Sequence, residues 1–438
     1  MRKSFVAGAL AGVLLSGFSA STFVSLARAE AAAPVKELTL EQALVMAKRS
    51  NKTLVVERTR LAQAQVSVDQ AWSVLFPTLA AQGKYSRNNA QVEFPGLGRI
   101  QPYNQLDASL TASTLLFAPA AYSGLRAVQA GLVGAEQNML VSEDALLFAV
   151  AQTFYGAAIA DEVMTARDSN IAVARATLET AQTRFSGGAV TKVDVDRAQL
   201  AVLRAEQAKR EAQLARSQSY RALSTLIGAE GAFRVVPTAP SSTGQAGEAV
   251  GGDLDLVLKL RPEFRALEAM ERESELERKS YLLRWAPSIS AFGNARVFNY
   301  KNFAQDNHSW VVGATLDWVL YDGGVRDNQR HLYVARLAEA KARAEVFRES
   351  VRDDIANGKD TIDTKRRAQQ TAERSVGLAQ ETVDLTRTQY EAGSATQIDV
   401  LQAQDALVAA QDALARAHFD IALADLGLRR AAGTFPPR

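Results

Sequence analysis

One segment of the chain occurs twice without a gap, and this duplication constrains the fold more than any other feature. Residues 188–199 read GAVTKVDVDRAQ and residues 393–404 read GSATQIDVLQAQ, at a constant offset of 205 positions. Identities at the same offset continue as far as Gly228 and Gly433. An internal repeat of this kind predicts two copies of one structural unit.

The duplication extends into the earlier part of each half. Gly83 corresponds to Gly293 at an offset of 210, whereas Leu116 corresponds to Leu320 at an offset of 204. The first copy therefore carries six more residues between Gly83 and Leu116, where we expect a surface loop. The two structural repeats are residues 30–236 and 254–438. Residues 237–253 between them have the Pro, Ser and Gly content of an exposed linker.

The amino terminus has the pattern of a secretory signal peptide. Arg2 and Lys3 precede an apolar run over residues 5–15, and Ala27-Arg28-Ala29 supplies the small residues of a cleavage site. A membrane anchor is the alternative, but the apolar run is shorter than the roughly 20 residues that a bilayer requires. We therefore expect residues 1–29 to be removed by cleavage after Ala29.

Charge and cysteine content exclude several classes of protein. Removal of residues 1–29 takes away three basic residues and no acidic one, so 50 Lys and Arg become 47 against 48 Asp and Glu. This mature chain has no basic excess for binding nucleic acid. The absence of cysteine excludes disulfides, thiolate metal sites and an acylated amino-terminal cysteine. No uninterrupted apolar run after Ala29 approaches 18 residues, which argues against helical membrane spans but not against β-strands.

Helical periodicity dominates both halves. Helices are predicted over residues 40–75, 120–185, 192–227, 254–284, 327–391 and 397–432. The two longest, about 65 residues each, would reach roughly 100 Å, which no compact globule accommodates. The third helix carries the stripe of a coiled-coil seam, formed by Val195, Ala198, Val202, Ala205, Ala208, Ala212, Ala215, Ser219, Ala222 and Leu226. The helices alone are equally compatible with an ordinary helical bundle or a cytoskeletal coiled coil.

Four short segments alternate apolar and polar residues with the period of two that is typical of β-strands. They are residues 79–85, 106–116, 289–297 and 310–320, one predicted hairpin in each half. Strands of about 10 residues match the bilayer crossing of outer-membrane barrels, but a small barrel needs about eight strands. The chain must therefore share its strands within an oligomer if the sheet meets lipid. Two roles are equally compatible with the sequence for four aromatic residues, namely a place in an aromatic girdle at the membrane interface or ordinary packing. These residues are Tyr103, Tyr300, Trp310 and Trp318.

The order of these parts resembles the TolC-like outer membrane efflux family over essentially the whole mature chain. The most specific pieces are the paired Gly-x-x-Thr-x-x-Asp-Val-x-x-Ala-Gln segments that begin at Gly188 and Gly393. Supporting pieces are residues 38–44 (LTLEQAL), residues 261–264 (RPEF) and the prolines that precede each hairpin. Each piece is weak alone, and their order carries the resemblance.

The resemblance implies a mostly α-helical chain with a transmembrane β portion. Three chains would give four strands each to one twelve-stranded β-barrel, continued by a long α-helical barrel across the periplasm. Family members are passive exit ducts of tripartite efflux pumps or type I secretion systems in the outer membrane. The implied partners are two further copies of the chain (a homotrimer), outer-membrane lipid, a periplasmic adaptor (membrane fusion protein) and an inner-membrane transporter.

The resemblance also places the turns that meet the adaptor at the periplasmic tip. Here those turns are Gly187-Gly188 and Gly393. Glycine enters left-handed conformations cheaply, and Thr191 and Thr396 are placed to cap the helices that follow. This structural role is expected of these residues whether or not the resemblance holds.

The expected channel entrance involves four residues near these turns. Asp399 matches an acidic position of the family's entrance ring, and Gln402 stands at the next ring position. Tyr390 and Asp194 match positions that brace the closed tip. A basic gate position is occupied by Ala395, so the usual gate ion pairs are not expected.

Two interpretations of the acidic residues Asp194 and Asp399 stay open. Each is placed as an amino-terminal helix acid, which interacts favourably with the helix dipole. Alternatively, three Asp399 carboxylates around a narrow axis would favour cations, and their mutual repulsion would raise some of their pKa values. Such a ring would respond to pH.

No catalytic constellation is found in the sequence, and we expect neither an enzyme nor a cofactor. His308, His331 and His418 lack metal-ligand spacing, and residues 187–192 lack the ending of a phosphate-binding loop. The competing function is a non-conducting periplasmic coiled-coil adaptor or tether. That alternative does not require two strand pairs of bilayer length.

Overall fold

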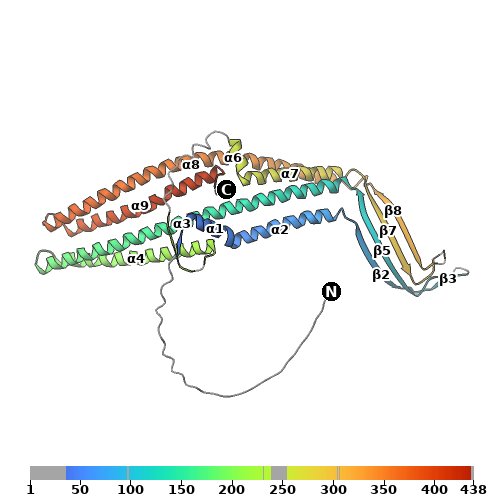
Figure 1. Cartoon of the computed structure of the whole chain (residues 1–438), viewed down its shortest axis with the longest axis horizontal. Helices are drawn as coiled ribbons and strands as arrows, with labels where there is room; N and C mark the ends of the chain where they lie inside the picture. The colour runs from blue at the N-terminus through green and yellow to red at the C-terminus, as the bar shows by residue number, and fades with distance from the viewer. Residues whose placement is uncertain are drawn as a thin grey trace, which may run out of the picture.

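The computed structural model describes residues 36–435 except 96–97, 230, 238–253, 303 and 305. The predicted signal peptide (1–29) and all of the predicted linker except Pro237 lie outside the described residues. Long helices run between a four-stranded sheet at one end of the molecule and two helical turns at the other (Figure 1). This extended form agrees with the predicted lengths of the helices.

The two halves contain the same elements in the same order. The first contains α1 (Leu40–Ser50), α2 (Lys52–Ser73), β2 (Thr78–Arg87), β5 (Asn104–Phe117), α3 (Pro119–Ser186) and α4 (Lys192–Ile227). The second contains α6 (Leu254–Leu260), α7 (Pro262–Leu283), β7 (Ser288–Phe298), β8 (His308–Asp317), α8 (Val325–Glu391) and α9 (Gln397–Ala431). The predicted duplication is therefore present in the structure.

The four long strands form one antiparallel sheet in the order β2-β5-β7-β8. The pairs β2–β5 and β7–β8 are the two predicted hairpins, and β5 joins them by pairing with β7. In this order β2 and β8 each have a strand neighbour on one side only. A single chain therefore provides an open sheet with two edges.

The register gives this sheet one apolar and one polar face. Leu110 lies opposite Ala81 and Ala295, and Ala295 lies opposite Trp310, so these four residues share a face. Trp310 is 75% exposed and Val312, two residues along the same strand, is 73% exposed. A contiguous exposed apolar face of this kind is typical of a surface that meets a partner or a membrane. The other face carries polar residues, among them Gln82, Lys84, Ser109, Thr111, Asn294 and Arg296.

The six additional residues of the first half lie in the connection between β2 and β5. This connection contains a small antiparallel ladder of β3 (Val92–Phe94) and β4 (Gly98–Gln101). The loop predicted between Gly83 and Leu116 is thus confirmed, with a short hairpin inside it. It lies at the end of the sheet that is farthest from the helices (Figure 1).

The predicted helices 40–75 and 254–284 are each broken, which corrects the sequence analysis. Asn51 ends α1 and caps α2, since its side-chain oxygen accepts a hydrogen bond from the Thr53 amide at 2.8 Å. Arg261 precedes Pro262, which disfavours the helical conformation at residue 261, and its backbone is extended. These two positions correspond at the offset of 210, so both copies are broken at the same place.

The main hydrophobic core lies at the break beside Asn51, near the middle of the helical part (Figure 1). Phe154 of α3 packs there with Leu54, Leu223 and Ile227, all almost completely buried. A parallel pair of three-residue strands, β1 (Lys36–Leu38) and β6 (Phe233–Val235), closes the core. The sequence analysis did not predict this pair.

The predicted seam of α4 is correct over its first half only. Ala198, Val202, Ala205 and Ala212 are buried, whereas Ala215 and Ala222 are exposed. The later core residues are Leu223 and Ile227, one position beyond the predicted Ala222 and Leu226. The buried stripe shifts because the large side chains, rather than the alanines, enter the main core.

Helix α3 is the most apolar of the long helices. It contains an 18-residue window with a mean hydropathy of 1.2, so that by length and composition it is able to cross a membrane, and 44% of that window is buried within the chain. Polar residues interrupt this window, so the sequence analysis, which considered only uninterrupted apolar runs, did not identify it. Helix α3 also contributes Val150, Phe154 and Ala157 to the main core, which accounts for part of its apolar character.

Candidate functional site

Helices α3 and α8 both end at the tip in the same hydrogen-bonded motif. After α3, the Gly188 amide donates to the Phe185 carbonyl at 2.9 Å and the Ala189 amide donates to the Arg184 carbonyl at 2.8 Å. After α8, the Gly393 amide donates to Tyr390 at 3.1 Å and the Ser394 amide donates to Gln389 at 2.9 Å. These are paired Schellman motifs, which satisfy carbonyls that the helix end leaves free.

The glycine of each motif has a left-handed backbone. Gly188 has φ of 74° and Gly393 has φ of 82°, whereas Gly187 remains in the right-handed region at φ of −80°. Only Gly188 and Gly393 therefore require glycine for conformational reasons. The sequence analysis assigned all three glycines to the turns without separating them.

The helices that follow begin with matching caps. The Asp194 carboxylate accepts hydrogen bonds from the Thr191 amide at 3.0 Å and the Thr191 hydroxyl at 2.8 Å. Asp399 accepts from the Thr396 amide at 2.8 Å and the Thr396 hydroxyl at 2.6 Å. The predicted capping of α4 and α9 at these threonines is confirmed. Each aspartate also lies in the first turn of its helix, where a negative charge is favourable.

These hydrogen bonds lower the pKa of both aspartates. The Thr191 hydroxyl and amide lower the pKa of Asp194, and the cation of Arg197, with its Nη1 3.6 Å from Oδ1, adds to this. The Thr396 hydroxyl and amide lower the pKa of Asp399. Within one chain, the ionised form of each carboxylate is therefore the form that the tip stabilises.

Tyr390 connects the two turns. Its side chain is 5% exposed, and the Arg184 guanidinium lies 4.6 Å from the centre of its ring. The same guanidinium donates hydrogen bonds to the carbonyl of Tyr390 and, at 3.5 Å, to that of Glu391. Burial raises the pKa of the Tyr390 phenol, Arg184 opposes this, and the negative charge of Asp194 adds to the increase. Tyr390 and Asp194 are thus electrostatic neighbours across the tip.

Further polar contacts hold α3 against α9, on the side of the turns that faces the rest of the molecule. The Gln404 amide donates to the Thr177 hydroxyl at 2.8 Å, and Arg167 forms an ion pair of 2.6 Å with Asp412. Beside them, an open groove of about 400 Å³ runs between α3 and the α8–α9 hairpin, with Tyr390 among its lining residues. The two hairpins therefore touch in one chain while leaving a cleft between them.

The remaining predicted entrance residues lie apart from these contacts. Asp399 and Gln402 are both exposed, and no hydrogen bond or ion pair is recorded for Gln402 within the described part of the chain. Ala395, at the expected basic position, is half-buried. In a single chain Tyr390 is buried beside Arg184, whereas Asp399 and Gln402 lie at the surface.

The sequence analysis missed two residues of the tip. Arg184 was not singled out, although its counterpart in the other copy is Gln389, and this difference between the copies is a usable signal. Gln397 is 2% exposed, and neither of its side-chain polar atoms has a partner among the described residues. Its counterpart Lys192 is exposed, so this position also distinguishes the copies.

The described residues contain no group of three or more His, Asp or Glu side chains arranged to hold a metal ion. His418 lies 3.5 Å from Glu162 on the helical surface, with both side chains about two-fifths exposed. The geometry of the tip is that of a packed and capped helix end.

A protein-family comparison matches both halves of the chain. The profile of the family described as Outer membrane efflux protein matches residues 43–229 and 254–434. Outer membrane protein TolC of Vibrio cholerae is 25% identical over 435 residues, which cover 94% of each chain. Nodulation protein T of Rhizobium leguminosarum bv. trifolii is 25% identical over 374 residues, which cover 83% of this chain and 78% of that protein.

Solved structures share the fold along nearly the whole chain. The outer membrane protein VceC of Vibrio cholerae aligns with a TM-score of 0.75 at 18% identity, covering 90% of this chain and 96% of VceC. The open state of the MtrE outer membrane channel of Neisseria gonorrhoeae aligns with a TM-score of 0.75 at 19% identity, covering 90% of this chain and 88% of MtrE. The paired helical turns and the four-stranded sheet thus belong to a known architecture.

Proposed function

Because the chain belongs to the outer membrane efflux protein family, we propose that three copies assemble into one continuous conduit. The protein is an outer-membrane efflux channel whose helical part extends into the periplasm. The assembly step and the partners named below are our proposal. We assign the protein no catalytic activity and no cofactor, because a conduit requires neither.

The open sheet is the observation that carries this proposal. Strands β2 and β8 each have an unpaired edge, and unpaired backbone groups are too costly to leave facing lipid. Four strands are also too few to close a barrel of about eight or more. Three copies, with β8 of one beside β2 of the next, would give twelve strands and remove every edge. The apolar face would then meet lipid and the polar face would line the pore.

The long helices supply the periplasmic part of the conduit. Helices α3 and α8 contain 68 and 67 residues, respectively, and continue directly from the sheet towards the tips. At 1.5 Å per residue each spans about 100 Å. Three copies of the paired hairpins would surround a tunnel of this length.

We assign the tip turns to the binding of a periplasmic adaptor, which in turn meets an inner-membrane transporter. Beside the turns Gly187-Gly188-Thr191 and Gly393-Thr396 lie apolar side chains that are only partly covered by the described part of the chain. Phe185 is 46% exposed, Val193 is 55% exposed and Ile398 is 41% exposed. Three apolar residues at the end of a long helical rod are suited to a protein partner.

We assign Asp399 and Gln402 to the channel entrance, with Tyr390 and Asp194 bracing the closed tip. Three exposed Asp399 carboxylates around the axis would favour the entry of cations. Replacement Asp399→Ala should weaken the cation preference of the channel in a lipid bilayer. The variant Asp405→Ala, an exposed acid six residues further along α9, serves as the control. Unchanged selectivity for Asp399→Ala would contradict the acidic entrance.

Two alternatives are less well supported. A non-conducting periplasmic adaptor or tether does not require a four-stranded sheet with an exposed apolar face, and the matched family is an efflux family. A role in a type I secretion system stays a prediction, because the sheet and the tips would serve either system equally. We favour the efflux pump on the family description alone.

The shared barrel can be tested by cross-linking the edges of the sheet. The chain has no cysteine, so Ala81→Cys in β2 and Val312→Cys in β8 would carry the only thiols. With a flexible reagent that joins two thiols, we expect covalent trimers on a denaturing gel. The control pair Ala108→Cys and Ala291→Cys lies in the central strands β5 and β7 and should stay monomeric. Monomers from the edge pair in intact membranes would contradict the proposal.

A further inference from the structure

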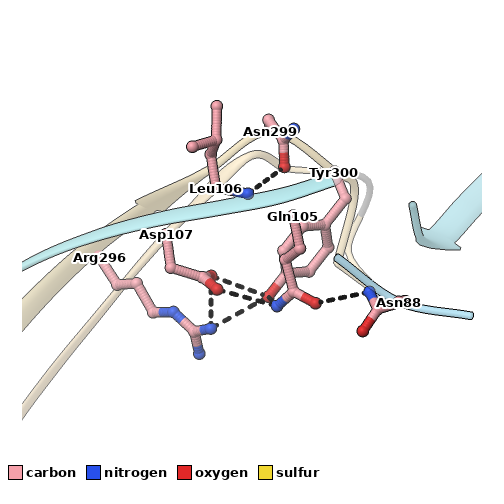
Figure 2. A network of polar contacts seen from close by, with 7 residues as sticks. All are labelled: Asn88, Gln105, Leu106, Asp107, Arg296, Asn299 and Tyr300. Atoms are coloured by element: carbon pink, nitrogen blue, oxygen red, sulfur yellow. Dashed lines mark hydrogen bonds and ion pairs between the residues drawn. The ribbon is translucent and has the colours of Figure 1, made fainter. Parts of the chain in front are cut away.

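A compact polar network joins β5, β7 and the chain that follows β7 (Figure 2). By the register of the strands it lies on the polar face, towards the end of the sheet that is farthest from the helices (Figure 1). The Arg296 guanidinium forms an ion pair of 2.5 Å with Asp107. The Tyr300 hydroxyl and the Gln105 amide also donate to Asp107, at 3.1 Å and 2.8 Å, respectively. The side chain of Asp107 is 9% exposed and that of Arg296 is 41% exposed. The carboxylate is therefore enclosed, while part of the guanidinium faces outwards.

The same network fixes the chain that leaves β7. The Asn299 side chain accepts a hydrogen bond from the Leu106 amide at 2.9 Å and donates one to the Asn104 carbonyl at 2.8 Å. The Tyr300 ring stacks on Phe298 with centres 4.5 Å apart. Tyr300 therefore lies over the polar face and takes no part in a lipid-facing aromatic girdle, which was one of its two predicted positions. These contacts hold Arg296 in one place.

A second cation stands beside this network. Lys84 of β2 lies directly opposite Asp107 of β5 in the antiparallel register, so the two side chains leave the same face of the sheet. Lys84 is exposed, and no ion pair is recorded for it within the described residues. Because Arg296 already pairs with Asp107, the charge of Lys84 is not neutralised by the network.

The charges of the polar face are therefore uneven along the strands. Among the described residues of the four strands, two cations (Lys84 and Arg296) and one anion (Asp107) lie at the outer end of this face. Asp317 shares the face but lies eight residues along β8 from Ser309, the residue opposite Arg296. At 3.4 Å per residue this is about 27 Å, well beyond the screening length of about 10 Å at 0.1 M salt. Within the four strands, the polar face of each chain thus carries one net positive charge at its outer end.

We propose that Lys84 and Arg296 form a positively charged ring at the outer mouth of the channel, which favours the exit of anionic solutes. This inference rests on the proposed trimeric conduit, in which the polar face lines the pore. Three chains would place three net positive charges around one opening, where low-dielectric walls concentrate the field. Guanidinium and ammonium groups attract carboxylates and phosphates, which are the chemical class that the ring would favour.

Lys84 allows the ring to be tested without disturbing the network. We would purify Lys84→Gln and Lys84→Arg, insert them in planar bilayers and measure the reversal potential across a KCl gradient near 0.1 M. The ratio of chloride to potassium permeability should fall by about twofold in Lys84→Gln and stay unchanged in Lys84→Arg. The difference should shrink in 1 M salt, where the screening length is about 3 Å.

A charge-neutral pair of substitutions separates charge from structure. Arg296→Gln should lower the permeability ratio as Lys84→Gln does, whereas the double variant Asp107→Asn with Arg296→Gln should leave it unchanged, because one charge of each sign is lost. Each variant would first be checked for the mass of the unaltered assembly in detergent. Normal conductance with unaltered selectivity in both Lys84→Gln and Arg296→Gln would overturn the ring alone. An unaltered protein without any conductance would overturn both the conduit and the ring.

Discussion

The two turns at the tip have the same backbone but different surroundings. Phe185 and Tyr390 occupy equivalent positions at the offset of 205, yet Phe185 is 46% exposed and Tyr390 is 5% exposed. Arg184 contributes to this difference, because it reaches from the first turn to the ring and the carbonyl of Tyr390. The second copy has Gln389 in that position. The duplicated residues thus fix the local fold, and the residues that differ determine which turn is buried.

The largest expected effect concerns the two aromatic rings. Tyr390→Ala should lower the free energy of local unfolding at the α8–α9 turn by about 3–5 kcal/mol, because it empties a buried aromatic site. Phe185→Ala, at an exposed position, should change the first turn by only about 0.5 kcal/mol. Hydrogen exchange of the turn amides measures both. Equal losses would contradict the difference in burial between the turns.

The left-handed glycines should show the next largest effect. Gly188→Ala and Gly393→Ala should each cost about 1–2 kcal/mol, because a Cβ strains a left-handed backbone even where the surrounding space is open. Gly187→Ala is the matched control, since its backbone is right-handed, and should cost far less. Thermal unfolding of the three purified variants ranks them. A Gly187→Ala loss as large as that of Gly188→Ala would contradict the assigned conformations.

The threonine caps should contribute less, and Thr396 should contribute at least as much as Thr191, because its hydroxyl also accepts a hydrogen bond from the Asp399 amide at 3.4 Å. Thr191→Ala and Thr396→Ala each remove the hydroxyl that donates to an aspartate, and each should cost about 1 kcal/mol. Thr382→Ala is a control within α8, where the hydroxyl donates to the Leu378 carbonyl of the same helix. Hydrogen exchange in the first turns of α4 and α9 gives the comparison. A clearly larger loss for Thr191→Ala than for Thr396→Ala would contradict this order.

The smallest expected effect is a response of the caps to acid. Because the folded pKa values of Asp194 and Asp399 lie below the ordinary value of 3.8, the caps contribute fully above that pH. Their contribution is lost as the pH falls through the lowered values. Amide protection of both turns should therefore stay constant from pH 7 to about 5 and decline below about 4. Asp399→Asn should abolish the decline at α9 only.

The same titration tests the assembled entrance. If three Asp399 carboxylates meet around the axis, their repulsion would raise the pKa of Asp399. The decline in amide protection at α9 would then move to higher pH. Asp194, which has Arg197 beside it, should not shift. A shift confined to Asp399 would thus support the acidic ring. Equally lowered pKa values of Asp194 and Asp399 in the assembled protein would show that both residues act only as helix caps.

Local sequence patterns predicted most of the fold. The alternation of residues 106–116 located β5 and its apolar face, and the Gly-x-x-Thr-x-x-Asp pattern located both turns with their caps. These features depend on neighbouring residues, so a single sequence contains them. The six extra residues of the first copy were visible because the second copy supplied the comparison.

The features that were missed depend on residues distant in the sequence. Strands β1 and β6 contain three residues each, too few for a periodic signal, and pair across the whole first half. The break at Asn51 is held in place by its bond to the Leu226 carbonyl at 2.8 Å. Arg184 and Tyr300 each act on the opposite half of the chain. No local pattern reports such contacts, although the difference between Arg184 and its counterpart Gln389 was available in the sequence.

The central claim is that one chain supplies a third of a closed channel. The most direct test is the mass of the mature protein extracted from outer membranes in mild detergent, with the bound detergent subtracted. The open sheet with its two free edges predicts an oligomer, and the proposed trimer predicts a mass three times that of one chain. A monomer that stays soluble without detergent would contradict the shared barrel and favour a non-conducting periplasmic coiled coil.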